Sequence, residues 1–247
     1  MSAVTATTIN AAGMEFRELN DRIAQNAEKD LVLRDVLGQR FLAAGRKSGG
    51  LEIHGVPGNA LGAYLNGAEI TVRGNAQDAT GDTMNAGRVI IHGSSGDATG
   101  YAMRGGEIYI KGRVGHRAGI HMKAYKTNIP HLVVGGGAGS FLGEYQAGGV
   151  ILLLGLGCEN EFPVGYYCGT GMHGGKIYIR TAHPPKGLPP HVRFRPADGE
   201  DSAVIRPLVK RWCALFGVPE DDIYTQPFQV LEPDTEGADV QHYTANR

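Results

Sequence analysis

The stretch GVPGNALGAYLNGAEITVR (55–73) decides the fold, because the next two blocks of 19 residues repeat it in register: GNAQDATGDTMNAGRVIIH (74–92) and GSSGDATGYAMRGGEIYIK (93–111). The pattern continues with insertions to Arg180, and a degenerate copy at 38–54 precedes it, which makes seven copies. Each copy ends in an alternation of apolar and polar residues, as in Glu69-Ile70-Thr71-Val72. Strict alternation is typical of a strand with one buried face.

The short period of the repeat limits the possible architectures. A block of 19 residues cannot hold a crossover helix, since a βαβ unit needs about 30 residues. We therefore predict an all-β core, a single-stranded, right-handed parallel β-helix of about seven coils stacked about 4.8 Å apart. The predicted organisation is an N-terminal extension with a capping helix (1–35), the β-helix (36–180), and a Pro-rich linker with an amphipathic helix and tail (181–247).

Glycine is the unusual component, with 38 of 247 residues, about twice the usual share. Ten glycines fall into two columns of the repeat: Gly62, Gly81, Gly100, Gly119 and Gly143, and, just before the strands, Gly67, Gly87, Gly106, Gly149 and Gly175. Corners of a tight coil need positive φ or close backbone approach, so we interpret both columns as structural. The GxGxxG match at 169–174 precedes a strand pattern, whereas a dinucleotide site needs a helix there.

Both flanks contain helical patterns. Phe16, Leu19 and Ile23 recur at helical spacing and predict a short helix that caps the first coil. An apolar stripe from Val204 to Phe216 predicts an amphipathic helix that ends at Gly217. The tail from Thr225 onward has little core-forming pattern and is expected to lie on a partner.

An apolar stripe marks the outward side of the predicted strands. Its members are Ile90, Tyr109, Leu152, Leu154 and Tyr178. Such a stripe on a polar sheet face is typical of a docking surface, so we predict subunit docking here. Two occupants remain open, the C-terminal helix of the same chain and a partner protein.

Asp78 and Asp97 are the weaker candidates for chemistry. They share one column of the repeat, four residues after each opening glycine, so stacking would place them about 5 Å apart. Acid–base chemistry in an independent β-helical hydrolase is one hypothesis; ordinary turn residues repeated by periodicity are the other. The three cysteines form no CxxC pair and the histidines have no metal-ligand spacing, so we predict no catalytic, cofactor or metal site.

The charge balance and hydropathy exclude other classes. With 24 basic and 25 acidic residues, nothing indicates binding to nucleic acid. No apolar run approaches the roughly 20 residues of a membrane span, and the N-terminal residues lack the pattern of a signal peptide. We therefore expect a cytoplasmic protein with no membrane partner.

The repeats also resemble a known family. The segments GNALGAYLNGAEITVRG, GIHMKAY, FLGEYQAGGVI and GTGMHGGKIYIR resemble the GXGXG β-helix domain at the C-terminal end of the glutamate synthase large subunit. In particular they are similar to the stand-alone form found where that subunit is split into separate chains. The resemblance covers about residues 36–180.

The resemblance implies a scaffold. In that family the β-helix has no catalytic residue and braces a class II glutamine amidotransferase, with its N-terminal cysteine nucleophile, against an FMN and iron–sulfur synthase unit. Ammonia from glutamine passes through a tunnel between them and aminates 2-oxoglutarate. The chain begins Met1-Ser2 and has no cysteine cluster, so only the scaffold part is expected here. FMN and the iron–sulfur cluster are expected on a partner subunit.

Other complexes share the repeat. The C subunit of formylmethanofuran dehydrogenase and its relative in formyltransferase/hydrolase complexes are built from similar coils. Split synthases that make N-methylglutamate or another amino acid are also open. The acceptor substrate, electron donor and stoichiometry do not follow from the sequence.

Overall fold

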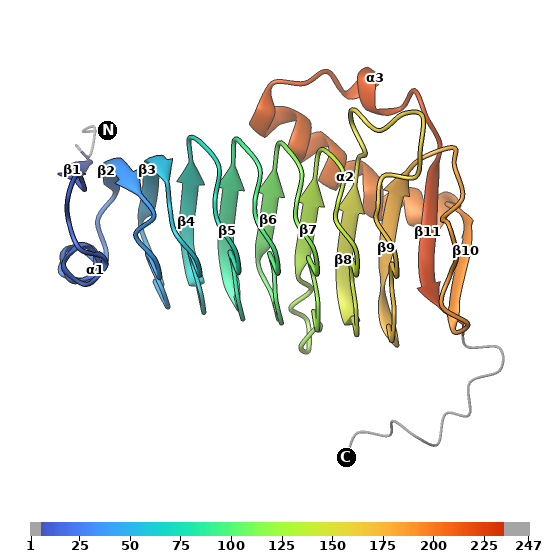
Figure 1. Cartoon of the computed structure of the whole chain (residues 1–247), viewed down its shortest axis with the longest axis horizontal. Coiled ribbons are helices and arrows are strands. Elements are labelled where there is room, and N and C mark those ends of the chain that lie inside the picture. The colour runs from blue at the N-terminus through green and yellow to red at the C-terminus, as the bar shows by residue number, and fades with distance from the viewer. Residues whose placement is uncertain (1–5, 235–247) are drawn as a thin grey trace, which may run out of the picture.

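The computed structural model describes residues 6–234, and its eleven strands form one sheet (Figure 1). The strand order is β1-β2-β3-β4-β5-β6-β7-β8-β9-β11-β10. The strands are β1 (Thr7–Asn10), β2 (Leu31–Leu37), β3 (Gly50–Val56), β4 (Asn66–Val72), β5 (Ala86–Ile91), β6 (Glu107–Ile110), β7 (His131–Val134), β8 (Ala147–Leu153), β9 (Gly174–Arg180), β10 (Val192–Pro196) and β11 (Phe228–Pro233). The helices are α1 (Phe16–Ala24), α2 (Gly199–Phe216) and α3 (Glu220–Ile223). The all-β core predicted from the repeat is confirmed.

Strands β1 to β9 are parallel and follow one another in chain order. The register pairs equivalent positions of the repeat, with Ile70 opposite Val89 and Val89 opposite Ile108. These three side chains are fully buried, because every second residue of each strand faces the core. The connections pair as well, through single parallel bridges that join Ala76, Ser95, Val114, Ala138 and Val164 in series.

The ten column glycines all have left-handed or similar backbone, with φ between 64° and 137°. In the first column a Cβ would strike the core; at Gly81 it would lie 2.4 Å from Ile108 Cδ1. In the second column it would strike the preceding repeat; at Gly87 it would lie 2.3 Å from the Ala68 carbonyl oxygen. Both positions therefore need the conformational freedom and the small size of glycine.

The N-terminal segment belongs to the sheet, which corrects the predicted boundary. The parallel sheet begins at Thr7 in β1 and continues through β2, so it starts well before residue 36. Helix α1 lies in the connection between these two strands, at the end of the stack (Figure 1). Its buried residues Leu19 and Ile23 join the main core, as the helical spacing predicted.

The C-terminal segment contributes strands as well as a helix. Asp198 caps α2 by accepting the backbone N–H groups of Glu200 and Asp201, and Gly217 ends the helix with φ 68°. Strand β11 then pairs antiparallel with β9 on one side and β10 on the other. The prediction that the tail lies on a partner is therefore wrong for Phe228–Pro233, because this segment completes the chain's own sheet; residues 235–247 lie outside the described residues.

Candidate functional site

The predicted docking face is covered by the chain itself. The five residues Ile90, Tyr109, Leu152, Leu154 and Tyr178 are at most 4% exposed, and they form one apolar cluster with the inner side of α2 and with Val230 of β11. Figure 1 shows α2 lying across several neighbouring strands, behind the arrows. The sequence left open whether the C-terminal helix of the same chain or a partner protein covers this stripe. In the structure, the helix of the same chain covers it. These residues therefore offer no exposed docking surface, which corrects that expectation.

Two polar anchors fix α2 on this face. Trp212 Nε1 donates to the Ile110 carbonyl oxygen at 2.8 Å, and the ring is buried. At the other end, the buried Asp201 carboxylate accepts from Lys176 Nζ and Arg195 Nη1, both at 2.6 Å. Burial opposes ionisation of Asp201, but these charged donors outweigh it and hold the pKa of the carboxyl well below its usual range.

The column of Asp78 and Asp97 forms a ladder of hydrogen bonds between repeats. Asp78 Oδ1 accepts the Asp97 N–H at 2.9 Å, and Asp97 Oδ1 accepts the His116 N–H at 2.7 Å. The same column begins with Asn59 and continues through His116 and Ser140. An acceptor side chain is thus needed at each step to satisfy a backbone donor, which accounts for the recurrence of Asn, Asp and Ser in this column, as the hypothesis of ordinary turn residues predicts.

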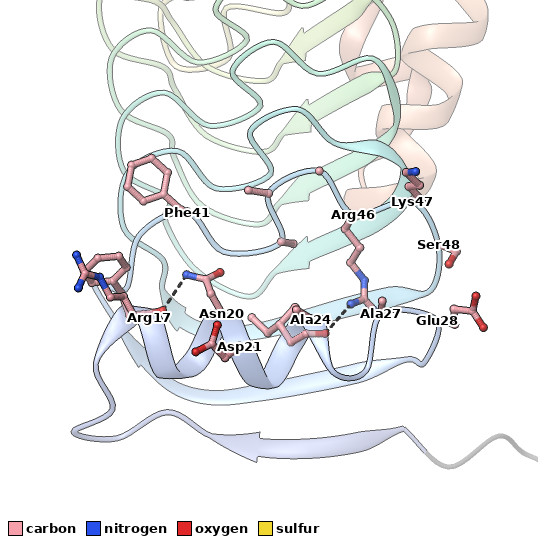
Figure 2. Close-up of a pocket in the computed structure, with 15 residues that line it drawn as sticks. Arg17, Asn20, Asp21, Ala24, Ala27, Glu28, Phe41, Arg46, Lys47 and Ser48 are labelled. Atoms are coloured by element: carbon pink, nitrogen blue, oxygen red, sulfur yellow. Dashed lines mark hydrogen bonds between the residues drawn. The ribbon is translucent and has the colours of Figure 1, made fainter.

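An open cavity of about 720 Å³ lies between α1 and the connection that follows β2 (Figure 2). Figure 2 shows Arg46 reaching from this connection to the end of the helix. Its guanidinium donates to the carbonyl oxygens of Ile23, Asn26 and Lys29, and burial lowers its pKa. A cation at a helix C-terminus donates hydrogen bonds to the free carbonyl groups and interacts favourably with the helix dipole. The polar groups here therefore hold α1 in place.

Aromatic side chains, most of them exposed, gather on the connections before β6, β7, β8 and β9. We call this surface the aromatic face; its residues are Tyr101, Arg117, His121, Phe141, Tyr145, Tyr166 and Tyr167. The rings of His121 and Tyr145 stack at 5.2 Å, those of Phe141 and Tyr167 stack at 5.0 Å, and the Arg117 guanidinium lies 4.8 Å from the Phe141 ring centre. Tyr166 and Tyr167 are each more than 60% exposed. Tyr, Phe and Arg are the residues enriched at protein interfaces.

The backbone of the aromatic face is unusual. His121, Phe141 and Tyr145 have φ between 52° and 65°, and Arg117 and Tyr167 are also left-handed. Stacking of the repeats imposes this conformation, because the His121 N–H donates to the Glu144 carbonyl oxygen and the Tyr145 N–H to that of Thr170. The same columns are left-handed at Ala60, Ala79 and Ala98, so this conformation belongs to the repeat, and the aromatic side chains distinguish this surface.

The sequence-based interpretation missed this surface, although a signal was present. The two left-handed columns lie four residues apart in each connection, as in Arg117 and His121 or Phe141 and Tyr145. In the middle repeats the same columns hold small residues, including Ala79, Ala98 and Ala102. Aligning these two columns shows that their side chains change from small to aromatic along the repeats. The prediction of a docking surface was based on the strands and not on these connections.

The described residues contain no group of three His, Cys, Asp or Glu side chains arranged to hold a metal ion. Within the same residues, no helix has the length and apolar content to cross a membrane. The fold and the surface together describe a class of protein. It is a repeat protein with a continuous parallel sheet, helix α2 of the same chain over one face of that sheet, and an exposed aromatic face on the connections.

Comparison with known proteins gives the family. The family model described as "GXGXG motif" matches residues 25–231, most of the chain, so the chain belongs to the GXGXG motif family. An uncharacterized protein, MJ1350, of Methanocaldococcus jannaschii is 46% identical over 231 residues, which cover 90% of this chain and 88% of that protein. The match includes strands β2 to β10 and most of β11, and it begins after β1.

Proposed function

We propose that the chain is a non-catalytic structural subunit of a multi-subunit glutamate synthase-type complex. In this proposal it braces a class II glutamine amidotransferase subunit against an FMN and iron–sulfur synthase subunit and helps to enclose the passage for ammonia. The GXGXG domain occurs in glutamate synthase, and the family match covers most of this chain. The assembly is expected to use 2-oxoglutarate as the substrate that it aminates.

The observation that carries the proposal is the aromatic face. It combines exposed rings with an arginine, Arg117, that lies over the Phe141 ring. Burial of such rings against a partner would recover the hydrophobic free energy that exposure forfeits, about 25 cal/mol per Å² of apolar surface. A surface of this composition suits a stable protein partner better than a small substrate.

We further infer that the repeats coil as a single right-handed parallel β-helix. Two observations support this finer description. Equivalent residues of the strands pair in parallel, and equivalent residues of the connections also pair or hydrogen-bond from one repeat to the next. Right-handed crossover is the rule for parallel connections in general.

The predictions on cofactors and location complete the proposal. FMN and the iron–sulfur cluster would be held by the synthase subunit, and this chain would bind neither. Neither nucleic acid nor a membrane is expected as a partner, and the cytoplasm remains the predicted location. These statements stay predictions that purification of the complex would test.

The test is assembly with the two partner subunits. The chain should co-purify with an amidotransferase chain and a flavin-containing chain, and the assembly should carry out glutamine-dependent amination of 2-oxoglutarate. Replacing both Tyr145 and Tyr167 by Ser should weaken binding of one partner at least about 30-fold, since the loss of a single hot-spot ring already costs about 2 kcal/mol.

Tyr64→Ser is the matched control. Tyr64 has the same left-handed conformation as Tyr145, with φ 58°, and is 59% exposed, but it lies at the other end of the stack. Its replacement should leave binding unchanged. Assembly that survives the double substitution would contradict the role of the aromatic face; an assembly without flavin or amidotransferase would contradict the proposed complex.

A further inference from the structure

A second ladder of hydrogen bonds runs beside the Asp78 column, one residue after the opening glycine of each block. Asn75 Oδ1 accepts the Ser94 N–H at 2.8 Å, and Ser94 Oγ accepts the Arg113 N–H at 3.2 Å. The next member of this column is Gly137, because Gly136 bonds to Gly112 as Gly112 bonds to Gly93. Each side chain thus supplies the acceptor for the amide of the following repeat.

The ladder breaks between Arg113 and Gly137. A guanidinium has donors only, so Arg113 cannot accept the Gly137 N–H in the way that Asn75 and Ser94 accept their neighbours. The column then continues to Pro163, since the Ala138 N–H donates to its carbonyl oxygen, and proline has no N–H that needs an acceptor. The Gly137 amide therefore lacks a ladder oxygen, as does the Asn75 amide, which follows Val56 in this column.

A cavity of about 300 Å³ opens at this break, and Gly137 lines it. Three further donors line the same cavity: Arg113, His116 and Lys186. His116 Nδ1 accepts the Ser140 N–H at 3.0 Å, so the neutral ring carries its proton on Nε2. Neither cation takes part in an ion pair within residues 6–234.

The charge on the cavity wall favours an anion. Two cations, Arg113 and Lys186, face one carboxylate, that of Glu161, across the same lining. The small size of Gly137 also matters, because a Cβ there would lie 3.2 Å from Cys158 Sγ and 2.9 Å from the Pro163 carbonyl oxygen. Backbone amides near glycine, combined with basic side chains, are typical of sites for oxyanions.

We propose that this cavity binds a small oxyanion, a phosphate or carboxylate group, one oxygen of which accepts the Gly137 N–H in place of the missing ladder oxygen. Arg113, Lys186 and His116 Nε2 then supply charge and further donors to the other oxygens. Tyr166 of the aromatic face also lines the cavity, but anion binding to the chain alone does not require the partner subunits proposed above. The bound oxyanion would supply the acceptor that the ladder lacks between Arg113 and Gly137.

Cys158 provides a direct readout, because it lines the cavity and is partly exposed, whereas Cys168 and Cys213 are buried. The full chain is treated with iodoacetamide in inorganic phosphate, in succinate, or in chloride at equal ionic strength, and Tm is measured in the same buffers. We expect the bound anion to raise Tm by about 2–4 °C and to slow alkylation of Cys158 at least about threefold. An effect of phosphate alone identifies a phosphate site, and an effect of succinate identifies a carboxylate site; no effect of either relative to chloride would overturn the proposal.

Arg113→Asn tests the mechanism, since asparagine at this position can accept the Gly137 N–H as Asn75 accepts that of Ser94. It should raise Tm in chloride by about 2 °C and abolish the effects of the anion. Lys186→Gln, which leaves both ladders intact, should weaken anion binding at least about fivefold. Arg104→Gln removes an exposed charge away from the cavity and should change nothing. Retention of the anion effects in both cavity variants would refute the assignment.

Discussion

The outer face of the sheet has two parts that differ in side chains and in cover. Over β3 and β4 its central column holds Glu52 and Thr71, which are partly exposed. Over β5 to β9 the same column holds Ile90, Tyr109, Val133, Leu152 and Tyr178, all buried beneath α2, and Val230 of β11 extends the column by one strand. The inner face does not change along the sheet, because every repeat fills the same core.

Charges between repeats stabilise the uncovered part and continue into the border of the covered part at β5 and β6. Arg88 bridges Glu69 and Glu107 with N–O distances of 2.9 Å each, and Arg73 lies 3.2 Å from Glu52. Such exposed pairs contribute little, usually below about 1 kcal/mol. The repeat therefore determines the side chains of the inner column, whereas those of the outer column differ according to what packs over them.

The largest expected effect is that of Trp212→Ala in the covered part. It removes a buried ring that also donates to the Ile110 carbonyl oxygen. We expect the free energy of unfolding to fall by about 3–5 kcal/mol in urea titrations. Lys210→Ala, on the exposed side of the same helix, is the control and should cost less than about 0.5 kcal/mol. A loss below about 1 kcal/mol for Trp212→Ala would show that α2 does not stabilise this face.

Asp201→Asn should follow, with a loss of about 3 kcal/mol at pH 7, because it leaves the charges of Lys176 and Arg195 without their buried partner. The folded pKa of Asp201 is lowered, so its stabilisation is complete above the unfolded value of about 3.9 and is lost as pH falls below it. The difference between wild type and variant should thus be constant from about pH 6 to 8 and shrink below about pH 4. A difference that persists unchanged at low pH would contradict the ionised state assigned to Asp201.

A reciprocal pair of substitutions tests the boundary between the two parts. Ile90→Thr places a hydroxyl under α2 and should cost about 1–2 kcal/mol. Thr71→Ile, one strand away in the same column, should change the free energy of unfolding by less than about 0.5 kcal/mol, because no helix covers it. Chemical denaturation of both variants gives the comparison, and equal effects would mean that the covered part extends further than β5.

The smallest effect is expected for Arg211→Gln. Arg211 Nη1 lies 3.0 Å from Glu107 Oε2, but the arginine side chain is 49% exposed. We expect a loss of about 0.3 kcal/mol that disappears in about 0.5 M salt. A loss above about 1 kcal/mol would indicate that the edge of α2 relies on this charge pair.

Much of the fold could be predicted from local pattern. The alternation Ile70, Val72 and the glycine columns are properties of single repeats, and the period of 19 residues carries each feature into the next repeat. The boundaries were less predictable. Strand β1 has only four residues and β11 lies in a segment without clear alternation, so neither strand has a pattern of its own.

The candidate site was harder to predict, for a physical reason. The cover of the apolar stripe depends on contacts between residues about a hundred positions apart, such as Trp212 and Ile110. The aromatic face depends on stacking of connections that differ in length, and the break at Gly137 becomes visible only when Arg113 is seen beside it.

The sequence by itself therefore determined the repeat, the buried inner column and the corners, because these follow from periodicity and from the steric limits of the backbone. Only the tertiary structure decided that α2 covers the outer stripe, that aromatic side chains remain exposed on the connections, and that one ladder lacks an oxygen. Those features arise where segments distant in sequence meet, and local pattern carries no information on which segments will meet.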